Sequence, residues 1–126
     1  MRYRLVERIN PLNLAAPRKW YAIPFSDGRI QESHLARRIA GRASLTEGDV
    51  SSVIKNLLDE IPEYLLMGKS LNLEPFGSFR LSFGSEGVDD PADFHNSMIK
   101  HVRVIFTPGV RFKDALIRTS FERIDI

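Results

Sequence analysis

The sequence lacks the features that would assign it to a functional class at once. Its 126 residues include no cysteine, which excludes disulfide frameworks and zinc sites built from thiolates. The three histidines are far apart, and no run approaches the roughly 18 apolar residues of a membrane-spanning helix. There is no glycine-rich phosphate loop and no nucleophile-elbow motif. The sequence therefore predicts a protein that is not an enzyme and uses no cofactor, metal ion, membrane or small-molecule substrate.

The composition is typical of a single globular domain. Hydrophobic residues make up 43% and charged residues 27% of the chain, which excludes a disordered tail or a collagen-like repeat. The first eight residues contain no apolar segment of signal-peptide length, so a cytoplasmic location is expected.

Charge is unevenly distributed along the chain, although the net charge is only +2. Residues 1–42 carry nine basic and three acidic side chains, and residues 100–126 carry six and three. Between them, residues 43–99 carry three basic and ten acidic side chains. Two interpretations stay open: the basic ends converge into a face that favours a polyanion, or they form an ordinary solvated surface.

Periodicity predicts the order of the secondary-structure elements. Alternation and aromatic or β-branched content indicate early strands, and apolar residues at 3.6 spacing indicate helices after residue 32. The predicted elements are strands over 2–9 and 18–25, helices over 32–43 and 47–67, a hairpin over 70–83, a strand over 101–107, a short helix over 110–120 and a possible terminal strand within 121–126.

Three local features refine this outline. Thr46 and Asp49 have the spacing of a capping box at the start of the long helix. Pro62 lies inside that helix, and we expect a bend or a break between Leu58 and Pro62. Trp20 and Tyr21 are expected to pack on the core rather than to stack on bases.

Two segments carry the most specific signal in the chain. Residues 76–79 read Phe-Gly-Ser-Phe, and residues 106–116 read Phe-Thr-Pro-Gly-Val-Arg-Phe-Lys-Asp-Ala-Leu, and both follow two helices in the chain. This arrangement resembles the HU/IHF histone-like, nucleoid-associated DNA-binding proteins of bacteria over about residues 31–118. The strands before the first helix resemble the longer HU-related group with an N-terminal strand extension.

The resemblance implies an α+β fold of HU/IHF type. An N-terminal β-hairpin would precede two helices, an antiparallel β-sheet with a shortened arm, and a short C-terminal helix, in an intertwined homodimer. We expect one HU-like domain over 1–126, with a β extension over 1–30, a core over 31–120 and a tail over 121–126. Apolar side chains of the long helix and the sheet exceed what one small protomer would hide, which also favours a two-fold dimer.

The resemblance further implies an architectural protein of the nucleoid that binds double-stranded DNA with little sequence specificity. If the strands pair, alternation places Arg80 and Arg103 on the solvent face, opposite their apolar neighbours. The expected DNA-binding residues contact backbone phosphates and are Arg80, Lys100, Arg103, Arg111 and Lys113.

The segment corresponding to the family's DNA-binding arm departs from the family pattern. Residues 85–96 contain four carboxylates and no lysine or arginine, and they lack the Arg-Asn-Pro-x-Thr-Gly tip. Carboxylates repel phosphates. A second function therefore stays open: a dimeric structural or protein-interaction module that kept the fold and lost DNA binding.

Overall fold

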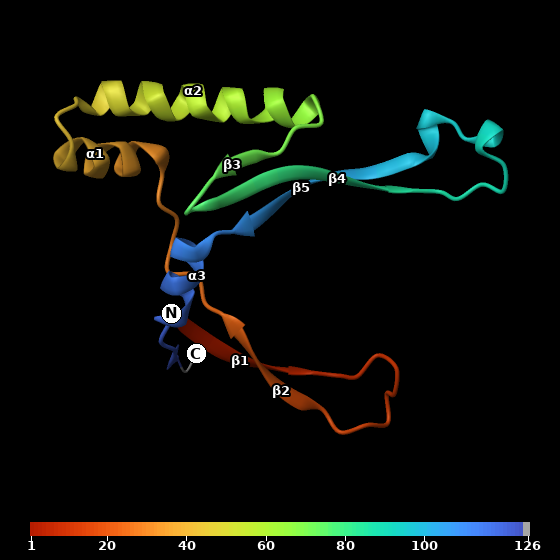
Figure 1. Cartoon of the computed structure of the whole chain (residues 1–126). Helices are drawn as coiled ribbons and strands as arrows, with labels where there is room; N and C mark the ends of the chain where they lie inside the picture. Colours follow the sequence, from red (N-terminus) through yellow and green to blue (C-terminus); the bar gives the residue numbers. More distant parts are fainter. Residues whose placement is uncertain (125–126) are drawn as a thin grey trace. The chain divides into compact units, whose positions relative to one another are not determined.

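The computed structural model describes residues 1–124 and has a mixed α+β fold, as the sequence predicted (Figure 1). The chain divides into two compact units: Glu32–Leu116, and Met1–Gln31 together with the segment from Ile117. The sequence predicts that the final residues form the tail of a single domain. In the structure they pair with the first strand and join the N-terminal unit. The end of the predicted tail, residues 125 and 126, lies outside the described residues.

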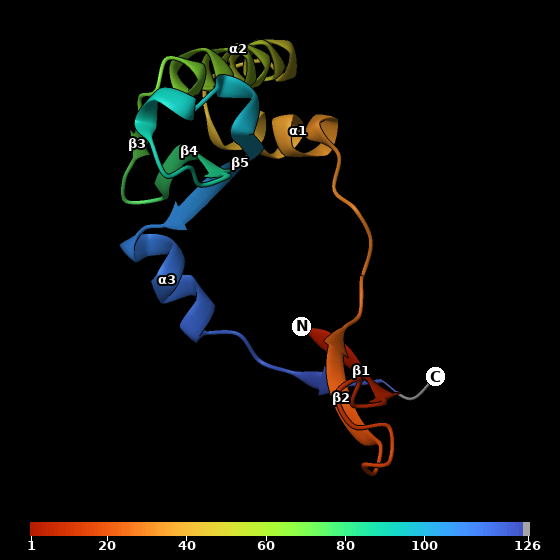
Figure 2. The same ribbon diagram turned by 90° about the vertical axis from the view of Figure 1, so that its right-hand side faces the viewer.

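The larger unit contains a helical pair, a three-stranded sheet and a short helix after the sheet. Its strands are antiparallel in the order β3-β4-β5, and α2 packs against β3 and β4 (Figures 1 and 2). In chain order the elements are α1 (Glu32–Arg42), α2 (Glu47–Leu66), β3 (Leu71–Leu73), β4 (Gly77–Ser85), the short 3-10 turns η1 (Pro91–Asp93) and η2 (Asn96–Met98), β5 (Ile99–Pro108) and α3 (Val110–Ile117).

The start of α2 confirms the predicted capping box. The Asp49 backbone N–H donates to the Thr46 hydroxyl at 3.1 Å, and the Thr46 N–H donates to the Asp49 carboxylate at 3.3 Å. These bonds satisfy two of the donors that every helix start leaves unpaired. The Ser51 hydroxyl also donates to the Glu32 carboxylate at 2.9 Å, which ties α2 to the start of α1.

Of the bend or break predicted between Leu58 and Pro62, the break is wrong. α2 runs without interruption from Glu47 to Leu66 with Pro62 inside it. Proline removes only its own N–H from the helix ladder. Leu65, three residues beyond Pro62, is buried, and α2 packs against β3 and β4, which supports the helix beyond the missing bond.

A cluster of four phenylalanines joins the sheet to α3. The ring centroids of Phe76, Phe79 and Phe112 lie 5.2, 4.9 and 5.9 Å from that of Phe106. Gly77 is buried beside this cluster. Only glycine fits there, because a Cβ would lie 2.5 Å from the Phe106 ring. The predicted hairpin over 70–83 is confirmed as β3 and β4, and the aromatic cluster fixes where that hairpin meets the end of β5.

The smaller unit is a single three-stranded sheet. The predicted N-terminal hairpin is confirmed as β1 (Arg2–Arg8) and β2 (Lys19–Pro24), which pair antiparallel, and β6 (Glu122–Arg123) pairs parallel with the start of β1. The Met1 ammonium group donates to the Ser120 carbonyl at 2.6 Å. Trp20 and Tyr21 are 64% and 48% exposed, contrary to the prediction that they pack on a core, because this unit has only one layer.

Candidate nucleic-acid interface

The sheet of the larger unit separates an apolar face from a basic one. Residues that face each other across antiparallel strands share a side of the sheet. Leu81 faces Val104, and both line the groove beside α2. Arg80 faces Ile105 and Ser82 faces Arg103, so Arg80 and Arg103 share the opposite side, as the sequence predicted. Both arginines are exposed.

An irregularity in β5 adds Lys100 to this basic side. The register shifts between the Ser82–Arg103 pair and the Gly84–Lys100 pair, which places one extra residue in β5. His101 lies at the shift and has a left-handed backbone with φ of 59°. Strict alternation would put Lys100 and Arg103 on opposite faces, but the bulge brings them to the same face. We call Arg80, Lys100 and Arg103 the basic sheet face.

Lys100 is the one member of this face that has an ion pair among those found in the described residues. Its ammonium group lies 2.5 Å from the Glu86 carboxylate, and both side chains are about half-exposed. An ion pair this exposed contributes little to stability, on the order of 0–1 kcal/mol. The lysine can therefore exchange this carboxylate for a phosphate at small cost.

The first turn of α3 is held in place by the turn between β3 and β4. The Gly109 N–H donates to the Phe76 carbonyl at 2.8 Å, and the Arg111 N–H donates to the Pro75 carbonyl at 3.2 Å. The side chains of Arg111 and Lys113 are exposed. The structure therefore divides the five predicted residues into two groups. Three lie on one face of the sheet, and two lie on α3, whose start is hydrogen-bonded to the turn of the same sheet.

The acidic segment after β4 forms local structure of its own. The Asp90 carboxylate accepts from the Ala92 N–H at 3.0 Å and caps η1, while Glu86 pairs with Lys100. Two of the carboxylates therefore have structural partners. Across residues 1–124, no group of three potential ligands is placed to hold a metal ion, and no helix there is long and apolar enough to span a membrane.

The N-terminal unit also separates its charges. Arg4, Arg8 and Lys19 share one face of the β1–β2 ribbon, because Arg8 faces Lys19 and Arg4 faces Ile23 across the strands. The signal was present in the alternation of β1. The pairing of β1 with β2 adds that Lys19 lies on the same face as Arg4 and Arg8.

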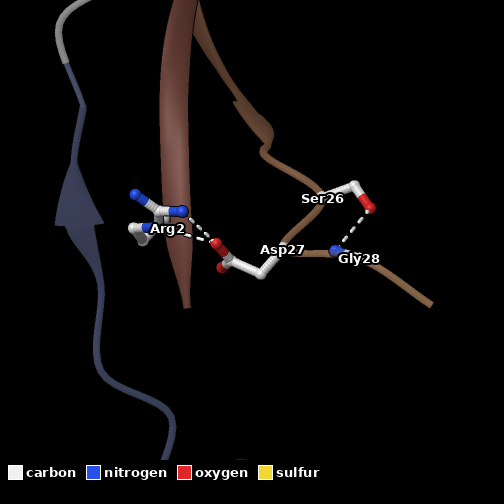
Figure 3. Close-up of polar contacts among 4 residues, drawn as sticks. All are labelled: Arg2, Ser26, Asp27 and Gly28. Carbon is white, nitrogen blue, oxygen red and sulfur yellow. Dashed lines mark hydrogen bonds and ion pairs between the residues drawn. The ribbon is translucent and has the colours of Figure 1, made fainter. Parts of the chain in front are cut away.

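Arg2 differs from these cations because it has a structural partner. Its guanidinium group pairs with the Asp27 carboxylate, with the Nε–Oδ1 distance at 2.8 Å, as Figure 3 shows. It also lies over the Phe25 ring, 5.1 Å from the centroid. The hydrogen bond from Arg2, together with its charge, holds the pKa of Asp27 below the usual value of an aspartate. The Ser26 hydroxyl accepts from the Gly28 N–H and shapes the turn that carries Asp27 (Figure 3).

The family model described as an HU domain fused to wHTH, Ig or a glycine-rich motif matches residues 1–123. The chain belongs to this HU-related family. The match includes the N-terminal strands as well as the helices and the larger sheet. It therefore confirms the resemblance to the longer HU-related group. No curated protein matches the chain significantly.

Two solved structures share the fold. A candidate bacterial DNA-binding protein from Bacteroides vulgatus ATCC 8482 aligns with a TM-score of 0.62 at 14% identity, over 98% of this chain and 48% of that protein. HU of Anabaena in a cocrystal with DNA aligns with a TM-score of 0.56 at 20% identity, over 71% of this chain and 100% of that protein. This HU-related chain thus spans about half the length of the Bacteroides protein.

Proposed function

We propose that this HU-related protein is an architectural protein of the nucleoid, in the cytoplasm, that binds double-stranded DNA with little sequence specificity. The observation that carries the proposal is the basic sheet face, where a bulge brings Lys100 to the side of Arg80 and Arg103. Family membership and the shared fold of the Anabaena HU–DNA cocrystal support it. Arg111 and Lys113 extend the contact from the start of α3.

The chemistry of these five residues favours phosphate contacts over base readout. Arginine and lysine are the side chains that most often contact backbone phosphates, and such contacts carry no sequence information. Each neutralised phosphate contributes about −0.9 to the slope of log affinity against log salt. A dimer with a few contacts per protomer should give a slope on the order of −4 to −8.

The exposed apolar surface of the larger unit supports a homodimer. Among the described residues only Ala36, Val50 and Leu65 form the buried apolar core, whereas Val102 and Val104 are 63% and 58% exposed. A second copy that covers the groove between α2 and the sheet would bury Val104, which lines that groove. Light scattering at micromolar concentration should give about twice the 14.4 kDa of one chain, and a monomer would contradict the dimer.

The binding proposal is tested by titrating unrelated duplexes at several salt concentrations. Wild-type protein should bind all of them with similar affinity, and Arg103→Ala, Arg111→Ala, Lys113→Ala should weaken all of them alike and flatten the salt slope. The acidic segment after β4 favours the other candidate, a protein-interaction module. No duplex binding at ~50 mM salt, where the electrostatic contribution is strong, would favour that module instead.

A further inference from the structure

We infer that the β1–β2 ribbon of the N-terminal unit is a second phosphate-contacting surface, which binds the backbone of duplex DNA. The residues that carry the inference are Arg4, Arg8 and Lys19, which share one exposed face of the ribbon and which we call the basic ribbon face. The identity of the partner rests on the proposed function. The surface itself is separate, because it lies in the other compact unit.

The basic ribbon face contains two like charges directly opposite each other. Arg8 and Lys19 are cross-strand partners, so their Cα atoms lie about 5 Å apart. Like charges at this position destabilise a strand pair. Both side chains are exposed, and none of the ion pairs found in the described residues includes either of them. An anion between them would turn the repulsion into two favourable contacts.

The carboxylates among the described residues of the unit lie away from Arg8 and Lys19. Glu7 faces Trp20 on the other side of the sheet, and Asp27 is occupied by Arg2. Glu122 pairs across from Arg2 at the other end of β1. None of the ion pairs found in the described residues includes Arg4, Arg8 or Lys19, so their positive charge remains available to an external polyanion.

The ribbon also has a shape that suits a groove of duplex DNA. β6 pairs only with the first two residues of β1, so the rest of β1 and β2 forms a two-stranded ribbon. A ribbon of this kind fits the major groove, which is about 12 Å wide. Arg4 and Arg8 are four residues apart on one strand, or about 13 Å. The row of cations can therefore reach phosphates on both sides of such a groove.

The loop end of the ribbon adds a hollow and an apolar tip. Arg8, Lys19 and Tyr21 line a hollow of about 590 Å³ beside the loop. At the tip, Leu12 is 95% exposed and follows Pro11. An acidic protein could also bind these positive charges, but its binding would not require a narrow two-stranded ribbon, whereas a DNA groove does.

The experiment compares three variants of the whole chain, each lacking three positive charges. The ribbon variant carries Arg4→Gln, Arg8→Gln and Lys19→Gln, and the sheet variant carries Arg80→Gln, Lys100→Gln and Arg103→Gln. The control variant removes exposed cations elsewhere, through Arg29→Gln, Arg38→Gln and Lys55→Gln. Fluorescence anisotropy with a labelled duplex gives the salt slope of each.

The ribbon variant should flatten the slope by up to about 2.7 per protomer, three contacts at about 0.9 each. The control variant should change it by less than one contact, about 0.9. An unchanged slope in the ribbon variant, with a flattened slope in the sheet variant, would overturn the inference and leave the proposed function standing. The reverse pattern would support the inference and reject the proposed sheet site. A wild-type chain that binds no duplex would reject both.

Lys19→Glu provides a variant that loses the phosphate contact without endangering the fold. Glutamate at position 19 would face Arg8 across the strands, and this pair of opposite charges stabilises the pairing of β1 with β2. Its melting temperature should match or exceed that of wild type, while its affinity for the duplex falls several-fold. A polyglutamate probe completes the test. Binding of that probe as tight as duplex binding, lost in the same variant, would show an acidic protein site and overturn the inference.

Discussion

Gly109→Ala is the substitution for which the structure gives the sharpest expectation. A Cβ on Gly109 would lie 2.9 Å from the carbonyl carbon of Pro75, and closer still to its oxygen. This neighbour is backbone in the turn between β3 and β4, so it cannot move aside as a flexible side chain would. The same turn accepts the hydrogen bonds that hold the first turn of α3. The added Cβ would therefore collide with the Pro75 carbonyl, which is the group that accepts the hydrogen bond from the Arg111 N–H.

The magnitude follows from these two effects. Overpacking a tight site costs roughly 1–3 kcal/mol, and weakening a hydrogen bond adds about 0.5–1.5 kcal/mol. We expect a loss of about 2–4 kcal/mol in the free energy of unfolding. For a unit of this size, 1 kcal/mol corresponds to about 4–8 °C in melting temperature. The melting temperature should therefore fall by at least about 8 °C, measured by circular dichroism at one fixed protein concentration.

Two other glycines are matched controls for the same chemical change. A Cβ on Gly41 or Gly87 meets nothing within 4 Å. Gly41 lies inside α1, where alanine is more favourable by roughly 0.5–1 kcal/mol, so Gly41→Ala should raise the melting temperature. Gly87→Ala should leave it nearly unchanged. If Gly109→Ala melts within about 2 °C of wild type, the steric reasoning is wrong.

Three further predictions concern single features. His101→Gly should be tolerated, because glycine accepts the left-handed backbone of the bulge, whereas His101→Val should cost on the order of 1–2 kcal/mol in chemical denaturation. The lowered pKa of Asp27 means that the stability from its pair with Arg2 is present above the pKa of the unfolded chain and is lost as pH falls through the lower folded value. Asp27→Asn should therefore reduce the loss of thermal stability between pH 5 and pH 3, by a small amount because the pair is exposed. Deleting residues 87–94 should change duplex affinity by less than tenfold, or about 1.4 kcal/mol, since the segment holds carboxylates and no cations; a larger loss in a binding titration would show that it grips DNA.

The elements that could be predicted from sequence are those determined locally. The capping box of Thr46 and Asp49 depends on a spacing of three residues, and the structure contains both of its hydrogen bonds. The prediction that Arg80 and Arg103 lie on one side of the sheet followed from the alternation of side chains along each strand. This alternation holds wherever the hydrogen-bond ladder is regular.

The features that sequence reasoning missed depend on contacts distant in the chain. No local signal marks His101 for a left-handed backbone, and the bulge that moves Lys100 to the face of Arg103 is set by the partner strand. Pro62 stays inside α2 because the sheet supports the helix from outside. Tyr21 is exposed because no second layer covers its strand, which depends on the fold of the whole unit.

The two segments that carried the resemblance contain determinants of the fold, and the second also carries Arg111 and Lys113 of the proposed binding site. Gly77 and Gly109 are the two glycines at which a Cβ would approach other atoms within 3 Å. Both lie where the start of β4, the end of β5 and the start of α3 meet around Phe76 and Phe106. Such a junction tolerates little change in size. The proposed binding depends on exposed cations, which can differ between surfaces without disturbing that junction. An acidic segment after β4 and a basic ribbon in the N-terminal unit are therefore compatible with one conserved architecture.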